Sequence, residues 1–200
     1  DRSCPDITAH ALRAFREWGD HVDGPLKSRL ECALKRGIAY LEASQTACGS
    51  WLPLWFGNQK AAGQANPTYG TAAVVMTLCA VAEDHPDTVA DSLKKGCRWL
   101  VSAQNSDGGW GGDLKVASSI EETALAVGAL IEAGVEYEKS QLAGIEWLLQ
   151  HTKDCTQWRP TPIGLYFSSL WYSERLYPRI FTMGALARAA ERFCGKSSPF

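Results

Sequence analysis

The stretch Gln104-Asn-Ser-Asp-Gly-Gly-Trp110 places an acid and two glycines in one turn, a combination typical of a functional loop. Taken alone, it is the first candidate for a site. The pattern has a copy at residues 45–51, however, and an eroded copy at residues 152–158. A feature that recurs in this way belongs to the architecture, so we interpret the stretch as a clamp between an outer and an inner helix.

The other residues that could do chemistry lack the spacings of common catalytic and metal sites. The seven cysteines (4, 32, 48, 79, 97, 155 and 194) include no Cys-x-x-Cys pair, which favours reduced thiols in a cytoplasm over disulfides or a zinc site. The sequence contains neither a nucleophile elbow nor a phosphate-binding glycine loop. We therefore expect no metal and no cofactor.

The composition is that of a globular protein, with 46% hydrophobic and 21% charged residues. The formal net charge of -2 provides no basic field for phosphate backbones, so nucleic acid is not an expected partner. No apolar run reaches the roughly 18 residues that a membrane-spanning helix needs. The unusual count is eight tryptophans, and those at 51, 99, 110, 147 and 158 lie in the repeated segments.

Two kinds of repeated segment alternate along the chain. Segments that precede the clamp turns are amphipathic at helical spacing, as with Leu34, Ile38 and Leu41, which predicts surface helices. Between them lie segments headed by a threonine, at residues 8, 71, 123 and 182. Those spanning 71–82 and 123–134 are apolar nearly all round, which predicts inner helices covered on every side.

This alternation predicts an all-α fold, an α/α toroid or partial α/α barrel in which inner helices line an axis and outer helices wrap them. Residues 1–200 are expected to form a single domain, and no strand is predicted. Two inserts, 52–69 and 157–176, fall on turns that enter inner helices, where a toroid exposes its central cavity. Loops on a rigid scaffold often carry function, so the inserts are candidate site segments.

The turns that end in Gln-x-x-x-Gly-x-Trp resemble the QW repeats of the squalene-hopene cyclase and oxidosqualene cyclase family, the class II triterpene cyclases. Further segments match the family's C-terminal region, in the same order, along almost the whole chain. These are Pro5-Asp-Ile-Thr-Ala-His10, Gly49-Ser-Trp51, Trp55, Tyr69-Gly-Thr71, Leu165-Tyr-Phe, Trp171-Tyr and Leu176-Tyr-Pro178.

The resemblance implies that an aspartic acid protonates a linear polyene, after which rings close through carbocations held by aromatic faces. The family's triple-aspartate acid motif, which lies upstream of the Asp-Ile-Thr-Ala-His segment, is absent from this chain. We therefore expect the C-terminal portion of a longer isomerase or lyase, inert by itself. Its partners would be an apolar polyprenoid substrate and the N-terminal part of the same enzyme, and any membrane contact would lie in that part.

Three catalytic candidates follow from the resemblance. Asp6 and His10 match family positions that hydrogen-bond and tune the catalytic acid, because an imidazolium beside a carboxyl group raises its acidity. Tyr69 matches a position near the acid that helps to return a proton. Without the resemblance, Asp6 would be interpreted as a helix N-cap and His10 as a satisfied core histidine.

The resemblance also implies a set of substrate-binding residues. Trp55 matches a position near the acid, and Tyr166 matches an aromatic residue that stabilises a late cation. Pro162 stands where the family has another aromatic residue, which leaves the ring-termination chemistry open. Further candidates for the cavity wall are Leu165, Phe167, Trp171 and Tyr172.

Other hypotheses remain beside the cyclase. The second is a non-catalytic α/α module that binds an apolar ligand or a partner protein. The β subunit of protein prenyltransferases shares the toroid but needs Asp-x-Cys as zinc ligands, and Asp113 is followed by Leu114 and Lys115. Four inner and three outer helices cannot close the family's six-hairpin ring. Either an upstream segment completes the ring, or an exposed apolar edge drives formation of a homo-oligomer.

Overall fold

The computed structural model describes residues 2–165 and 170–195 of the chain. Its α-helices are α1 (Pro5–Trp18), α2 (Gly24–Ser44), α3 (Pro67–Ala82), α4 (Pro86–Ala103), α5 (Ile120–Ala133), α6 (Glu138–Thr152) and α7 (Tyr177–Phe193). Short 3-10 turns span residues 19–21, 62–64 and 135–137. The strands are β1 (Phe56–Asn58), β2 (Ile163–Leu165) and β3 (Leu170–Tyr172).

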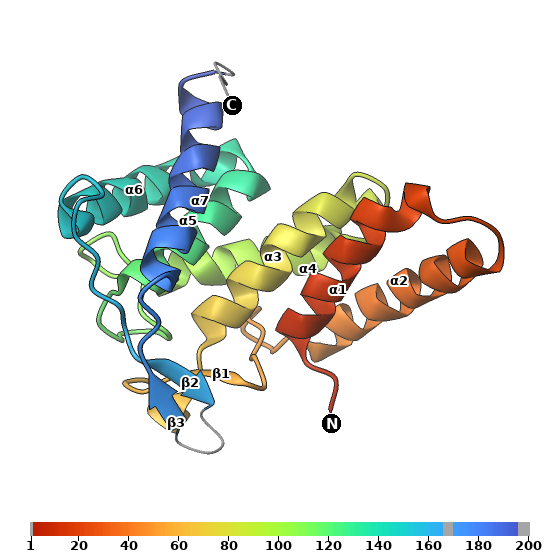
Figure 1. Ribbon diagram of the computed structural model, residues 1–200, viewed down its shortest axis with the longest axis horizontal. Helices are drawn as coiled ribbons and strands as arrows, with labels where there is room; N and C mark the ends of the chain where they lie inside the picture. The colour runs from red at the N-terminus through yellow and green to blue at the C-terminus, as the bar shows by residue number, and fades with distance from the viewer. Residues whose placement is uncertain (1, 166–169, 196–200) are drawn as a thin grey trace.

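The helices form two layers, as predicted. In the inner layer α1 packs on α3, α3 on α5, and α5 on α7, so that these helices follow one another in chain order (Figure 1). The outer helices α2, α4 and α6 pack on α1, α3 and α5 respectively. The alternation of inner and outer helices confirms the α/α toroid.

Burial follows the sequence pattern in both layers. Helix α3 lies between neighbours on several sides, and Ala72, Val75 and Leu78 are completely buried. Helix α2, by contrast, buries only Ile38 and Leu41 and leaves most of its charged residues in solvent. Because removing apolar surface from water drives packing, the difference in apolar pattern decides which helices are inside.

A glutamine in each of the first two clamp turns joins successive outer helices. At the end of α2, Gln45 Nε2 donates to the carbonyl of Gly49 in its own turn and to that of Ser92 on α4, both at 2.9 Å. Gln104, at the end of α4, donates in the same way within its turn at 2.8 Å and to Ser140 of α6 at 3.0 Å. These bonds use both donor hydrogens of each glutamine amide and tie each turn to the following outer helix.

The tryptophan that closes each of these turns ties an outer helix to the next inner helix. Trp51 Nε1 donates to the Leu41 carbonyl of α2 at 2.7 Å, and its backbone N–H donates to the Thr71 hydroxyl of α3 at 3.0 Å. Trp110 makes the same two bonds, to α4 and α5, at 2.7 and 2.9 Å. The predicted clamp between an outer and an inner helix is therefore confirmed for both turns.

The third, eroded turn has a different geometry. Lys153, Asp154 and Cys155 all have positive φ values, of 47°, 52° and 63°, so the chain leaves α6 in a left-handed bend. Trp158 is only half-buried, with the Arg179 guanidinium 6.0 Å from its ring centroid. The loss of the glutamine and glycine at this turn accompanies the loss of the deeply buried tryptophan.

A small antiparallel sheet, which the sequence pattern did not predict, joins the two inserts. Phe56 in β1 pairs with Leu165 in β2, and Leu165 pairs with Leu170 in β3. Figure 1 shows the sheet next to the starts of α3 and α7. Three-residue strands are too short to show alternation, and they pair across a long stretch of sequence, so local pattern could not reveal them.

The first and last inner helices carry exposed apolar side chains. Ile7 and Trp18 on α1, and Ile180 and Met183 on α7, are all more than half exposed. These positions form the apolar edge that was expected of an incomplete ring. Within the described part of the chain, no helix is both long and apolar enough to cross a membrane.

Candidate active site

A cavity of about 240 Å³ lies among the inner helices and β1. It receives residues from every inner helix, so its wall is assembled from segments far apart in the sequence. The lining residues are His10 from α1, Phe56 from β1, Asn66 and Tyr69 at the start of α3, Glu121, Glu122 and Leu125 from α5, and Tyr177 and Phe181 from α7.

Two pairs of aromatic rings form much of the cavity wall. Phe56 and Tyr69 stack with their centroids 4.6 Å apart and their planes inclined by 19°. The rings of Tyr177 and Phe181, both on α7, have their centroids 5.3 Å apart. The π-electron faces of such rings carry negative electrostatic potential and attract cations, most strongly where water is excluded.

Burial raises the pKa of Tyr69, and the nearby carboxylate of Asp6 raises it further. The pKa of Tyr177 is also raised by burial. Both phenols therefore keep their protons at neutral pH, and they add hydroxyl dipoles to the wall without adding charge.

Asp6 lies in the first turn of α1, where only 1% of its surface is exposed. Its carboxylate accepts a hydrogen bond from the Cys4 thiol, and burial raises the pKa of that thiol. The interpretation of Asp6 as the N-cap is wrong, because Cys4 occupies that position and Pro5 follows it. Asp6 instead sits where the positive end of the helix dipole favours a carboxylate.

His10 lies one helical turn after Asp6 and is exposed. The interpretation as a satisfied core histidine is therefore also wrong. A side chain that is open to its surroundings and lines the cavity is free to meet a group brought by another segment.

Glu121 and Glu122 are neighbours at the start of α5 and are both almost completely buried. The sequence pattern placed them in the first turn of a helix, where acids favour the dipole. Burial raises the pKa of both, that of Glu121 to about 7. Two buried carboxyl groups on one cavity wall were not anticipated as site residues.

The sequence model of the squalene-hopene cyclase C-terminal domain matches residues 1–191 of the chain. The chain belongs to this family. A probable squalene–hopene cyclase of Sinorhizobium fredii is 30% identical over 203 residues, which cover 94% of this chain and 28% of that protein. A terpene cyclase–glycosyl transferase fusion protein of Humicola fuscoatra is 29% identical over 96% of this chain and 16% of its own length.

Among solved structures, ent-copalyl diphosphate synthase from Streptomyces platensis matches with a TM-score of 0.69. The match covers 95% of this chain and 34% of that one, at 22% sequence identity, and shows the shared toroid fold. The chain thus spans about a quarter of the length of the squalene–hopene cyclase that it matches.

Only some of the site residues that the cyclase resemblance implied lie at the cavity. His10 and Tyr69 come together at the cavity, and Asp6 is close enough for its charge to act on Tyr69. Trp55 is half-buried just before β1, while Trp171 and Tyr172 lie in β3 and Leu165 in β2. Of these, Trp55, Trp171 and Tyr172 do not belong to the lining of the cavity as described. Tyr166 and Phe167 lie outside the described residues.

The sequence analysis did not identify several of the residues that line this cavity. They are Phe56, Asn66, Phe181, Glu121 and Glu122. Tyr177 stands within the quoted Leu176-Tyr-Pro178 segment, so the family pattern pointed near it. Phe56 and Asn66 lie in the first insert, which the sequence analysis named as a candidate site segment. No local pattern distinguishes Glu121 from an ordinary helix-start acid, because its burial depends on α3, α7 and the second insert.

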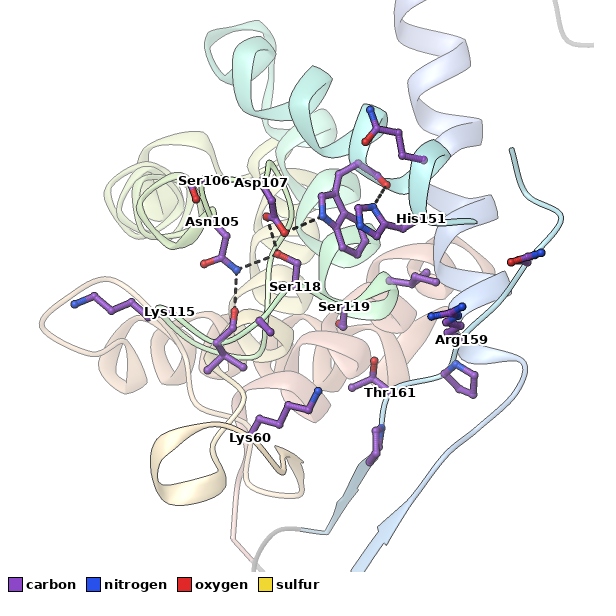
Figure 2. Close-up of a pocket in the computed structure, with 18 of the residues that line it drawn as sticks. Lys60, Asn105, Ser106, Asp107, Lys115, Ser118, Ser119, His151, Arg159 and Thr161 are labelled. Carbon is purple, nitrogen blue, oxygen red and sulfur yellow. Dashed lines mark hydrogen bonds between the residues drawn. The ribbon is translucent and has the colours of Figure 1, made fainter. Parts of the chain in front are cut away.

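A second, larger and more open pocket, of about 720 Å³, lies against the clamp turn of α4 (Figure 2). Asp107 there accepts hydrogen bonds from the Ser118 hydroxyl at 2.9 Å and from Trp147 Nε1 at 3.0 Å. Asn105 donates to Ser118 and to the carbonyl of Val116. The polar groups of the turn are thus engaged in holding the fold, which agrees with the interpretation of this stretch as a clamp.

Within residues 2–165 and 170–195, no group of three or more His, Cys, Asp or Glu side chains is arranged to hold a metal ion.

Proposed function

We propose that this chain forms one wall of the cavity in which a larger cyclase closes rings on a linear, squalene-like polyprenoid through carbocations. Residues 1–200 act in this proposal as a single domain. The observation that carries it is the meeting of His10, Tyr69 and Tyr177 from three inner helices around one aromatic cavity. Membership of the squalene-hopene cyclase family supports the reaction class.

The aromatic wall suits a reaction that passes through cations. The faces of Phe56, Tyr69 and Phe181 would stabilise positive charge on carbon without a nucleophile that could trap it. The same enclosed surroundings would keep water from ending the reaction early. Because the pKa of Tyr69 is raised, its hydroxyl remains protonated and does not compete as an anion.

Asp6 and His10 would act on an acid supplied by another part of the protein. The exposed imidazole of His10 would donate a hydrogen bond to the carboxylate of that acid and thereby increase the acidity of the acid. Asp6, fixed by Cys4 at the start of the same helix, would help to orient the groups around that acid. Tyr69, on the facing helix, would help to return the proton.

The cavity of about 240 Å³ is smaller than the roughly 300–1,000 Å³ of sites that enclose drug-sized ligands. We therefore propose that segments beyond this chain complete the substrate site. The apolar side chains on α1 and α7 mark the edges where those segments would dock.

The test is to express the protein encoded by the natural gene and incubate it with squalene, with squalene 2,3-epoxide and with geranylgeranyl diphosphate. Cyclic products are measured by gas chromatography and mass spectrometry, with boiled protein as the control. Formation of a cyclic terpenoid from any of the three supports the proposal. Tight binding of the polyprenes without turnover would contradict it and would favour the non-catalytic α/α module.

A further inference from the structure

Glu121 and Glu122 line the same cavity, yet their carboxyl groups are held very differently. Glu122 Oε1 accepts hydrogen bonds from Asn58 Nδ2 at 2.9 Å and from Asn66 Nδ2 at 3.0 Å. Its other oxygen accepts from the Ser119 hydroxyl, and Ser119 in turn caps the backbone N–H of Glu122. This carboxylate is fully engaged in joining β1, α3 and α5.

Glu121 keeps one oxygen free. Its Oε1 accepts a hydrogen bond from the backbone N–H of Thr161 at 2.8 Å, whereas Oε2 is buried without any hydrogen-bond partner. Only 3% of the residue is exposed. An unpartnered buried carboxyl oxygen costs about 1–3 kcal/mol or more, so natural folds rarely keep one without a use.

We propose that Glu121 is the catalytic base that ends the cyclisation by taking a proton from the final carbocation. The proposal rests on the function proposed above and adds the terminating step to it. A C–H bond next to the cationic carbon breaks, and its proton passes to the Glu121 carboxylate. The electron pair of that bond forms a carbon–carbon double bond with the cationic carbon, which leaves a neutral alkene and a neutral carboxylic acid.

The surroundings favour Glu121 over the other groups that line the cavity. Tyr69 and Tyr177 line the same cavity from α3 and α7, and the raised pKa of each keeps these phenols neutral and poorly basic. Glu122, its neighbour on α5, has its oxygens occupied, and His10 faces the cavity from α1. A pKa of about 7 lets Glu121 accept a proton and release it to solvent between turnovers.

The experiment compares Glu121→Gln with the control Glu132→Gln in the natural protein, with substrate consumption and product identity measured separately. Glu132 lies on the same helix, where it pairs with Arg188, and does not line the cavity. Glu121→Gln should still consume substrate but lower the yield of the alkene by at least about 100-fold, the usual contribution of a positioned base. Alcohols from water capture or isomeric alkenes should replace it. Glu132→Gln should leave the product ratio unchanged, and Glu121→Asp should restore part of the original alkene.

An unchanged product ratio in Glu121→Gln, or the same change in Glu132→Gln, would overturn the role of Glu121 while leaving the cyclase function in place. A natural protein that forms no cyclic product would overturn the proposed function, and the role of Glu121 with it.

If circular dichroism shows that Glu121→Gln does not fold, the role of Glu121 is tested instead with Glu121→Asp and with the pH profile of the natural protein. The ratio of alkene to alcohol must rise as pH increases through about 7, and a flat ratio would overturn the proposal.

Discussion

The indole of Trp51 rests so closely on Gly96 that a Cβ at residue 96 would come within 2.7 Å of the indole Cζ3. The next repeat has the same relationship, because a Cβ at Gly144 would lie 2.7 Å from Cζ3 of Trp110. Each clamp tryptophan thus packs on a glycine of the following outer helix. At Gly96 and Gly144 the missing side chain leaves room for the ring of the preceding clamp turn.

We expect Gly96→Ala to lower the free energy of unfolding by about 1–3 kcal/mol, because the added methyl group overpacks a completely buried ring. Gly128→Ala is the control, since a Cβ there would meet nothing closer than the 4.0 Å to Ala185. Alanine favours helix over glycine by about 1 kcal/mol, so this control should be neutral or more stable. Urea denaturation of the variants measures the difference, and equal effects would contradict the packing argument.

Thr123→Val should destabilise the protein by about 1–3 kcal/mol, because the buried backbone N–H of Trp110 loses its acceptor. Thr182 heads the corresponding segment of α7, and its buried hydroxyl has no hydrogen-bond partner. Thr182→Val should therefore be neutral or stabilising. Thermal unfolding followed by circular dichroism compares the two, and a larger loss at Thr182 would refute the assignment.

His10→Ala in the natural protein is expected to slow product formation by about 100-fold or more, as for the loss of a group that assists proton transfer. The fold should remain intact, because the side chain is exposed. Arg13→Ala, at another exposed position of α1, serves as the control. Near-normal turnover in His10→Ala would remove this residue from the catalytic set.

The stability of the chain should fall as pH rises from about 4.5 to about 7. Because the pKa of Glu121 is raised from 4.5 to about 7, folding favours its protonated form. That contribution is complete below the unfolded pKa and is lost as pH increases through the folded value. The total is up to about 3 kcal/mol at roughly 1.4 kcal/mol per pKa unit.

Urea denaturation at pH 5 and pH 8 tests this dependence. Glu121→Gln should reduce the difference between the two pH values, with the greater gain in stability at pH 8. Glu122 retains a pKa raised in the same direction, so part of the dependence should persist. An identical pH dependence in the variant would show that Glu121 does not carry the effect.

The 200-residue chain alone should self-associate through the apolar edges on α1 and α7. Light scattering should report species larger than a monomer, and the paired substitution of Ile180→Glu and Met183→Glu should shift them toward the monomer. A clean monomer of the original chain with little dye binding would instead indicate that this fold is self-sufficient.

The sequence by itself determined the order of helices, their inner or outer position and the clamp turns. These features depend on local periodicity and on contacts that recur in each repeat. In Trp51 and Trp110, for example, the same residue types at the same spacing make the same bonds. The family pattern added His10 and Tyr69, whose meeting at one cavity the structure then showed.

Only the tertiary structure decided which other groups face that cavity. The sequence pattern does not distinguish Glu121 from an ordinary acid in the first turn of a helix. Its burial arises because α3, α7 and the second insert close around it. Phe56 reaches Tyr69 through a sheet whose strands are too short to carry a pattern. Local sequence specifies local structure, but the desolvation that changes the chemistry of a side chain comes from segments distant along the chain.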